Sequence, residues 1–410
     1  ECVDALADEG LEPDEETQRL HEAIAQNALP RERPSVRNNL ERPPMPFFGR
    51  RAEMDLLKRE LQNRANRFIT LLGPGGIGKT RLAVEAAHES LAAFRDGVFL
   101  VSVPRGATPS QLLSVIAQCV GIPLKDQKDP KALVIDALRR KELLLIIDNG
   151  EHAVGATDLL EEVLQTTAVQ ILAASRERLH VTGELIVEIQ GLEYFKGDIG
   201  AVAGRTLARF DAVRLFVDRL RRVHHTFALS WETAPDVARI CRLAEGMPLA
   251  LELAASWGRA LSCREIADGI EENLRFLEAS SDAITPERRS VRGIFEHTWS
   301  LLSREEQASF ARLAVLHGGF SRPAAHRVAE AAPSMIMSLR DKALLQRAGS
   351  DRFAVHELLR QFAEEKLRAE PAAEAEARRA HGSFFADLLA AAGPRLYGPD
   401  QIAALDELQR

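Results

Sequence analysis

The 410-residue sequence contains little cysteine, few aromatic residues and no long apolar run. Its four cysteines lie far apart and include no C-x-x-C pair, which disfavours both a zinc site and a disulfide framework. We therefore expect a reducing, cytoplasmic compartment. No apolar stretch approaches the roughly 18 residues that a membrane-spanning helix requires, so we expect no membrane partner.

Aromatic residues make up only 5% of the chain, and alanine and leucine dominate its apolar residues. This composition favours helix over sheet for most of the length. The net charge of −7 argues against a surface that binds nucleic acid throughout. Hydrophobic residues at 46% and charged residues at 28% are ordinary globular values, which excludes disorder over the whole chain. At about 150 residues a domain, the length predicts two or three domains.

The amino-terminal residues predict a short helical region followed by a linker. Leucines and an isoleucine at helical spacing, with a turn near Gly10 and Pro13, predict a helical hairpin over residues 1–27. Residues 28–46 contain five prolines among charged residues, which predicts an extended linker without a core. The sequence begins with Glu1 and lacks a leader, so we expect it to be part of a longer protein.

Residues 47–200 alternate short apolar runs with amphipathic helical stretches. This alternation predicts an open α/β domain in which helices flank a parallel sheet. The runs are nearly continuous, as strands buried on both faces require. The expected strands are 68–72, 98–103, 143–147, 169–174 and 185–189, and the expected helices between them are 81–92, 109–120, 131–140 and 158–165.

Helical periodicity dominates after residue 200. One helical domain is expected over 201–285, broken by Gly246 and Pro248. Three helices, a hairpin around 348–351 and a closing helix predict a winged-helix domain over 286–370. Residues 371–410 are rich in alanine and predict the start of a carboxyl-terminal helical region.

A glycine-rich motif lies between the first expected strand and the first expected helix. The segment Gly73-Pro-Gly-Gly-Ile-Gly-Lys-Thr80 matches G-x-x-x-x-G-K-[ST], the phosphate-binding loop of P-loop NTPases. Its glycines let backbone N–H groups surround phosphate oxygens, and the following helix terminus adds positive potential. Lys79 would bridge the β- and γ-phosphates, and Thr80 would bind Mg²⁺. The expected nucleotide-binding residues here are Gly73, Gly75, Gly76, Ile77, Gly78, Lys79, Thr80 and Arg81.

An aspartate closes another apolar run. Asp148 follows residues 143–147 and would lie at the sheet edge where such folds bind ligands, so we expect it to bind or orient Mg²⁺ with Thr80. Asn149 stands where many ATPases have a second acid. Glu151 is then the nearest candidate to position the attacking water, and we expect slow hydrolysis.

An arginine follows a further expected strand. Arg176 comes directly after the run that ends in Ala173, Ala174 and Ser175. Its guanidinium could pair with the γ-phosphate and so distinguish a triphosphate from a diphosphate. A surface salt bridge is the alternative. With Asp148 and Glu151, Arg176 completes the candidate catalytic set.

Four more segments carry a family resemblance. They are Phe47-Phe-Gly-Arg-Arg-Ala-Glu53, Asp148-Asn-Gly-Glu-His152, Glu245-Gly-Met-Pro-Leu-Ala-Leu-Glu252 and Val355-His-Glu357. With the phosphate loop, they resemble the motifs of NB-ARC-type signal-transduction ATPases of the STAND class, most of all the ATPase region of bacterial SARP/LuxR-type transcriptional regulators. The first segment has Arg51 where the family usually has glutamate, and the last differs from Met-His-Asp at its first and third residues.

The resemblance assigns roles to three residues. It implies that Arg50 belongs to the nucleotide site and that Pro248 packs on the adenine. It also implies that His356 contacts the β-phosphate of ADP and holds a closed state. A helix-start histidine that contacts solvent or a neighbouring acid is the alternative for His356.

The expected fold is an α/β P-loop NTPase domain followed by a helical domain and a winged-helix domain. The resemblance implies an ATP/ADP-binding switch of a transcriptional regulator that uses Mg²⁺, is locked by ADP and forms a homo-oligomer when active. Residues 1–27 resemble the end of a bacterial transcriptional activation domain, which implies DNA contact through a domain absent from this chain. Residues 286–370 hold 14 Lys and Arg against 11 Asp and Glu, too small a surplus to drive DNA binding. A P-loop enzyme, either an active ATPase or a kinase, and a defence-receptor scaffold are the alternatives.

Overall fold

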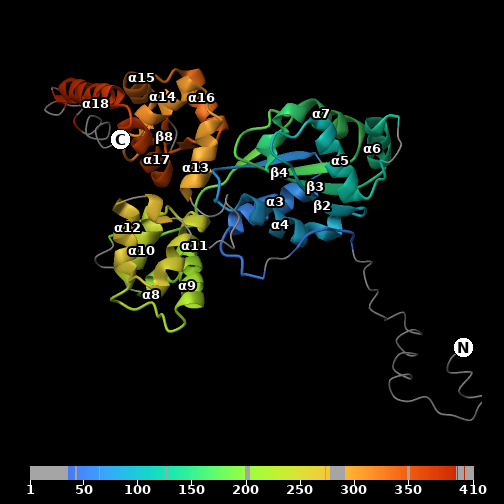
Figure 1. The fold of residues 1–410 in the computed structure, drawn as a ribbon, viewed down its shortest axis with the longest axis horizontal. Coiled ribbons are helices and arrows are strands. Elements are labelled where there is room, and N and C mark those ends of the chain that lie inside the picture. Colours follow the sequence, from blue (N-terminus) through green and yellow to red (C-terminus); the bar gives the residue numbers. More distant parts are fainter. Residues whose placement is uncertain are drawn as a thin grey trace, which may run out of the picture.

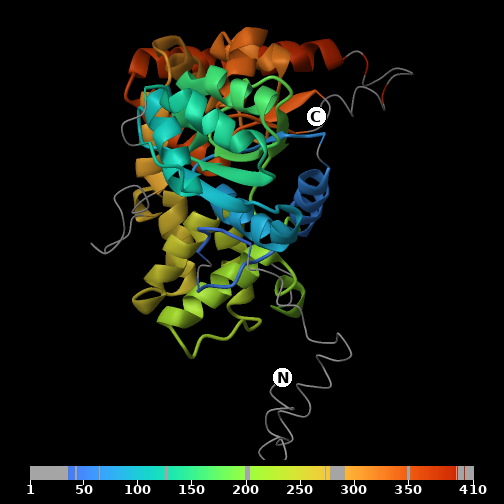
Figure 2. The ribbon, with the colours of Figure 1, turned by 90° about the vertical axis from the view of Figure 1, so that its right-hand side faces the viewer.

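The chain folds into an α/β domain and two helical groups (Figure 1). The α/β domain comes first in the sequence, and both helical groups lie to one side of it. A view turned by 90° shows the carboxyl-terminal helices extending along one end of the molecule (Figure 2). The predicted helical hairpin at 1–27 lies outside the described residues. The computed structural model describes residues 36–41, 44–63, 65–124, 128–198, 204–272, 274–277, 291–348, 351–393, 395 and 401.

The α/β domain contains a five-stranded parallel sheet. Its strands lie in the order β2-β3-β4-β1-β5. All five predicted strands are confirmed within one residue at each end, because strands buried on both faces leave nearly continuous apolar runs in the sequence. The strands are β1 (Phe68–Leu72), β2 (Gly97–Ser102), β3 (Leu143–Asp148), β4 (Gln170–Ser175) and β5 (Leu185–Glu188).

Helices cover both faces of the sheet. Alternate residues of β3 enter two different hydrophobic cores: Leu144 and Ile146 pack with α3 and α4, whereas Leu143 and Leu145 pack with the helices on the other face. The helix α3 was not predicted from the sequence. The five helices are α3 (Arg51–Gln62), α4 (Lys79–Ser90), α5 (Pro109–Val120), α6 (Pro130–Arg139) and α7 (Thr157–Thr166).

The described part of the predicted linker pairs with the edge strand β2. The side-chain amide of Asn39 donates to the carbonyl of Leu100 at 2.9 Å, and its oxygen accepts from the Leu100 N–H at 2.6 Å. The Val98 N–H donates to the Arg37 carbonyl at 3.0 Å. Residues 37–39 of the predicted linker are therefore attached to the sheet.

The first helical group packs α9 against α11 and α10 against α12. Its apolar core includes Phe216, Ile240 and Leu251, all fully buried. Two arginines near the end of α9 are ion-paired: Arg219 contacts Glu252 at 3.0 Å, and Arg222 contacts Asp218 at 3.2 Å. The helices are α8 (Gly204–Leu207), α9 (Asp211–Val223), α10 (Ala234–Leu243), α11 (Pro248–Ser256) and α12 (Cys263–Glu272).

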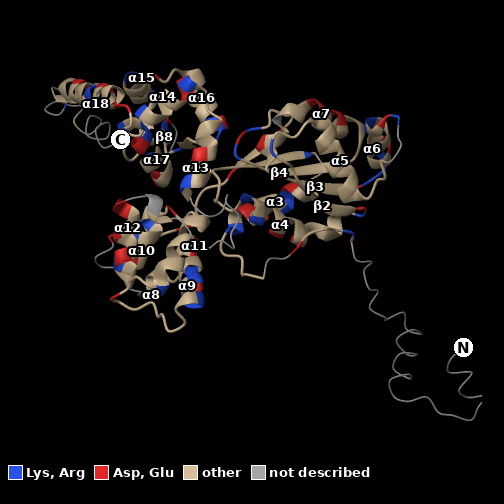
Figure 3. Cartoon of the chain, viewed as in Figure 1, with Lys and Arg blue, Asp and Glu red and all other residues tan. Residues whose placement is uncertain are grey.

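The second helical group, which we call the C-terminal group, contains a small antiparallel sheet of order β6-β8-β7. The predicted hairpin is present as β7 and β8, whereas β6 and α16 were not predicted. Lys and Arg positions alternate with Asp and Glu positions along its helices (Figure 3). Its elements are α13 (Val291–Ser300), α14 (Arg304–Leu313), β6 (Phe320–Ser321), α15 (Arg322–Ala329), α16 (Pro333–Asp341), β7 (Gln346–Arg347), β8 (Arg352–Ala354) and α17 (Glu357–Arg368).

The longest described helix, α18 (Pro371–Ala392), follows this group. It packs along α15 and α17. Its exposed side includes Phe385 and Leu389. Within the described ranges, no helix combines the length and apolar character that a bilayer span requires.

Candidate nucleotide-binding site

The glycine-rich loop connects the end of β1 to the start of α4, as the motif predicts. Gly76 and Gly78 have φ angles of +79° and +96°, a region that glycine enters without strain. A Cβ on Gly76 would also lie 3.0 Å from the Cβ of Leu249. The backbone of the loop is therefore free to curl around an anion at the helix N-terminus.

Lys79 lies at the start of α4 and is buried. Its Nζ donates to the carbonyls of Gly73 at 2.8 Å and Pro74 at 3.0 Å. Burial lowers the pKa of Lys79 to about 8, while Glu151 and Asp148 favour its charged form and Arg176 opposes it. A buried ammonium held by two neutral carbonyls is well prepared to pair with a phosphate.

Thr80 and Asp148 meet at the carboxyl edge of the sheet. The Thr80 hydroxyl donates to Asp148 Oδ1 at 2.5 Å. A hydroxyl and a carboxylate are ligands that Mg²⁺ uses together with phosphate oxygens and water. Among the residues that the structure describes, no group of three or more His, Cys, Asp and Glu side chains could hold a metal by itself. The pair therefore fits a Mg²⁺ ion that arrives with a nucleotide.

Glu151 pairs with Arg176. The backbone N–H of Arg176 donates to Glu151 Oε2 at 3.1 Å, and the side-chain Nε of Arg176 lies 3.2 Å from Glu151 Oε1. The Glu151 side chain is only 3% exposed, so this is a buried pair and not the surface salt bridge considered above. Within the described structure, Arg176 Nη1 is buried and has no hydrogen-bond partner. Glu151 thus fixes Arg176 and leaves one guanidinium nitrogen open to a ligand.

Arg50 reaches the phosphate loop, whereas Arg81 points elsewhere. Arg50 is buried, and its Nη2 donates to the Ile77 carbonyl at 3.0 Å. Arg81 instead donates to Glu85 Oε1 at 3.0 Å and to the carbonyl of Met45 at 2.6 Å. The nucleotide-binding role predicted for Arg81 therefore has no support from its side-chain contacts.

The start of α11 lies against the phosphate loop. The Leu249 N–H donates to the Gly76 carbonyl at 3.2 Å. Pro248 Cγ would lie 3.7 Å from a Cβ on Gly78. The structure therefore brings Pro248 to the loop, although the two segments are far apart in the sequence.

His356 is the N-cap residue of α17 and is buried. Its Nδ1 accepts from the Leu358 N–H at 3.3 Å, which implies that Nε2 carries the proton of the neutral ring. Nε2 has no hydrogen-bond partner in the described part of the chain and lies 3.8 Å from Glu245 Oε2. Burial lowers the pKa of His356 to about 4 and raises that of Glu245 to about 7.

A cavity of about 1020 Å³ contains both Arg50 and His356. The start of α3, the segment after β5 and the start of α9 form its other walls, with Tyr194 and Glu245 among the lining residues. Among the described residues, those of the phosphate loop itself do not line it. Arg50, which lines this cavity with His356, also contacts the loop through the Ile77 carbonyl.

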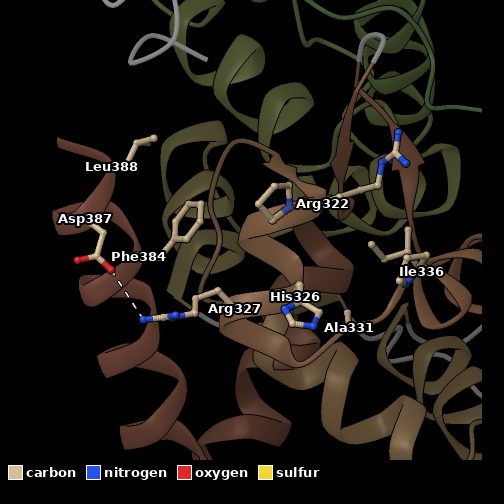
Figure 4. A pocket seen from close by; sticks show the side chains of 10 residues that line it. Arg322, His326, Arg327, Ala331, Ile336, Phe384, Asp387 and Leu388 are labelled. Carbon is tan, nitrogen blue, oxygen red and sulfur yellow. Dashed lines mark ion pairs between the residues drawn. The ribbon is translucent and has the colours of Figure 1, made fainter. Parts of the chain in front are cut away.

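A second cavity, of about 680 Å³, lies between α15 and α18 (Figure 4). Phe384 and Ile336 contribute apolar walls, and Arg327 pairs with Asp387 at 3.7 Å across the rim. The helices α15 and α18 lie far from α4, the helix that follows the phosphate loop (Figure 1). The sequence motifs did not point to it.

Sequence reasoning missed the contact of α13 with the phosphate loop. Ile294 Cγ2 would lie only 2.2 Å from a Cβ on Gly75. His297, one turn further along α13, lies beside His152, with ring centroids 6.1 Å apart. No local motif marks these residues, because their proximity depends on how distant elements pack.

Replacing Glu245 with glutamine should raise thermal stability at pH 8 but not at pH 5. The pKa of Glu245 is raised in the folded chain, so the folded state holds more protons than the unfolded state between about pH 4.5 and 7. The free energy of unfolding of the wild-type chain therefore falls as pH rises through that window, because Glu245 loses its proton. The variant should melt about 2–4 °C higher at pH 8 for each kcal/mol that the ionised carboxylate costs, as measured by scanning fluorimetry. Equal shifts at both pH values would contradict this assignment.

The chain resembles known proteins in sequence. A family model described as an AAA domain matches residues 62–182. The "Putative HTH-type transcriptional regulator Rv0890c" of Mycobacterium tuberculosis is 33% identical over 341 residues, which cover 79% of this chain and 36% of that relative. The "Uncharacterized protein Rv0894" of the same organism is 31% identical over 301 residues, which cover 72% of this chain and 71% of that relative.

Among solved structures, a STAND protein with a tetratricopeptide repeat sensor from Pyrococcus horikoshii is 18% identical, with a TM-score of 0.33. The match covers 91% of this chain and 52% of that one. The sequence matches confirm a P-loop ATPase domain with relatives among transcriptional regulators. The chain spans only about a third of the length of the regulator, and the NB-ARC subdivision stays a prediction.

Proposed function

Because this chain belongs to the same family as Rv0894 of M. tuberculosis and contains a P-loop ATPase domain, we propose that it is the nucleotide-dependent switch of a transcriptional regulator. It binds ATP or ADP with Mg²⁺, is held closed by ADP and opens on nucleotide exchange. Contact with DNA is made by another part of the full-length protein. Opening permits the module to form a homo-oligomer.

The observation that carries this proposal is the contact of the C-terminal group with the phosphate loop. Ile294 of α13 packs on Gly75, while Leu249 of α11 packs on Gly76. A nucleotide in the loop would therefore lie where three parts of the chain converge. Any change in its phosphates can alter how these parts pack.

A second contact links the same parts of the chain. Arg340 of α16 pairs with Glu188 at the end of β5 at 2.5 Å. The Arg178 N–H donates to the Asp341 carbonyl at 2.7 Å. Arg178 lies two residues after Arg176, so a movement of Arg176 toward a γ-phosphate would pull directly on the end of α16.

The switch uses different groups to detect different phosphates. His356 contacts the diphosphate, and Arg176 contacts the triphosphate. The domains over 47–200, 201–285 and 286–370 move relative to one another. The domain over 286–370 has the winged-helix fold. Reversing a population from 1:99 to 99:1 requires about 5.5 kcal/mol of differential binding. Two or three charge-assisted hydrogen bonds, each worth about 1.5–3 kcal/mol, supply that amount.

Slow hydrolysis follows from the pairing of Glu151 with Arg176. Both carboxylate oxygens of Glu151 contact Arg176, and the neighbouring Asn149 cannot act as a base. We expect fewer than about one ATP hydrolysed per second by the isolated chain. Faster turnover would favour the alternative of an active P-loop enzyme.

The nucleotide dependence of the shape tests the proposal. The nucleotide that copurifies with the chain is released by denaturation and identified by chromatography, and we expect ADP. Small-angle scattering of the ADP-bound and ATPγS-bound chain should then give different radii of gyration. Identical profiles with both nucleotides bound would contradict the switch.

Replacing Gly75 with alanine should displace α13 from the phosphate loop. The added methyl would lie 2.2 Å from Ile294 Cγ2, closer than carbon atoms approach. We expect hydrogen exchange in α13 to accelerate about tenfold or more in this variant. Gly382→Ala is the matched control, because nothing lies within 4 Å of its Cβ position. Unchanged protection of α13 would show that the contact does not hold the closed state.

Replacing His356 with alanine should weaken ADP binding and favour the open state. One hydrogen bond to a charged phosphate is worth about 1.5–3 kcal/mol, so the Kd for ADP should rise about tenfold or more. A titration with a fluorescent ADP analogue measures this. His326→Ala, at an exposed position in α15, should leave the affinity unchanged. Tighter ADP binding by the His356 variant would exclude the proposed role.

A further inference from the structure

One face of α13 meets the phosphate loop at the end that would hold a terminal phosphate. Ile294 and His297 are three residues apart and therefore share this face. Ile294 covers Gly75, and Arg176 Cζ would lie 3.3 Å from the Cβ position of the same glycine. Arg176 follows β4, the strand that pairs with β1 directly before the loop. The face thus borders both the loop and the arginine.

Two buried nitrogens at this place lack partners. His297 Nε2 and Arg176 Nη1 are both without a hydrogen bond in the described part of the chain. A buried polar group without a partner destabilises the folded chain. A ligand that accepts hydrogen bonds from both nitrogens would remove that destabilisation.

The charges around His297 favour an anion. Burial, Arg105 and Arg176 lower the pKa of His297, and the nearby His152 acts in the same direction, whereas Glu151 raises it. Lys79 is electrostatically coupled to Arg176, Glu151 and Asp148. Two arginines and one carboxylate therefore act on His297 directly, and the positive charges outnumber the negative one.

We propose that His297 contacts the terminal phosphate of a bound nucleoside triphosphate, together with Arg176. This inference rests on the proposed function and adds a residue of the C-terminal group to the triphosphate site. ADP lacks the phosphate that His297 binds, so the contact exists only with the triphosphate. With the triphosphate, α13 therefore stays beside the loop, and the opening on nucleotide exchange is a change in the pose of the C-terminal group about this contact.

The contact of His297 with the terminal phosphate would be transmitted to His356, which is proposed to contact the diphosphate. Phe295 of α13 packs edge-on against Phe362 of α17, with ring centroids 5.9 Å apart, and Arg292 pairs with Glu365. His356 is the N-cap residue of α17. The two histidines therefore lie on two elements that pack together, and each would bind a different phosphate of the nucleotide.

The experiment compares ATPγS and ADP binding by calorimetry in the full chain. His297→Ala should weaken ATPγS binding about tenfold, the effect of one charge-assisted hydrogen bond, and change ADP binding less than twofold. His297→Gln, which keeps an N–H donor near the same position, should restore most of the ATPγS affinity. His326→Ala serves as the control.

The pH dependence gives a second readout. An anion beside His297 raises its pKa, so wild-type affinity for ATPγS should increase more from pH 8 to pH 6 than that of His297→Ala. Equal losses for both nucleotides, or no loss for either, would overturn the role of His297. If the wild-type chain bound neither nucleotide, the proposed function itself would fail.

Discussion

Replacing Lys79 with methionine should weaken ADP and ATP binding by about 100-fold or more. The ammonium lies between the phosphate loop and the acidic sheet edge, where it would contact two phosphates in place of the carbonyls of Gly73 and Pro74. Each such contact is worth about 1.5–3 kcal/mol, and 100-fold corresponds to about 2.7 kcal/mol. A titration with a fluorescent ADP analogue measures the change.

The Lys79 variant should remain folded. Burial lowers the pKa of Lys79, which means that the folded state does not favour its charge. Methionine fills a similar volume without a charge, so the melting temperature in the absence of nucleotide should not fall. Lys58→Met, on the exposed side of α3, is the control. Unchanged affinity in the Lys79 variant would refute the phosphate-loop assignment.

Replacing Asp148 with asparagine should abolish the effect of Mg²⁺ on nucleotide affinity and lower the ATP turnover about 100-fold or more. Asparagine can still accept the hydrogen bond of the Thr80 hydroxyl. It cannot neutralise a divalent cation, however, and metal stabilisation of a phosphoryl transition state is worth several kcal/mol. Nucleotide titrations in Mg²⁺ and in EDTA, together with phosphate release, provide the measurements.

The exposed Asp158 of α7 supplies the control for this change. Asp158→Asn has the same chemistry and removes the same charge, so it should retain both the Mg²⁺ effect and the turnover. An Asp148 variant that still responds to Mg²⁺ as the wild type does would mean that another oxygen holds the metal.

Local patterns in the sequence predicted the sheet and the phosphate loop. The five strands could be found because each is buried on both faces and therefore nearly continuously apolar. Lys79 and Thr80 could be found because the phosphate-binding motif occupies eight consecutive residues. Asp148 could be placed because the carboxyl ends of parallel strands meet at one edge.

Contacts between distant segments could not be predicted in this way. Nothing near Ile294 indicates that it packs on Gly75, and nothing near Glu151 indicates that Arg176 occupies both of its oxygens. Arg81 shows the converse: the motif suggested a phosphate, but the nearby carbonyl of Met45 and the carboxylate of Glu85 bind its guanidinium. Such outcomes depend on tertiary packing, which residue spacing does not record.

The attachment of Asn39 to β2 fixes the first described residues at one border of the sheet. β2 is one outer strand of the sheet and β5 the other. The ion pair between Glu188 and Arg340 lies on the β5 side. This ion pair and the attachment of Asn39 therefore lie at opposite borders of the five-stranded sheet. The covered outer strand also offers fewer open backbone groups to a neighbouring molecule, which protects this border from edge-to-edge aggregation.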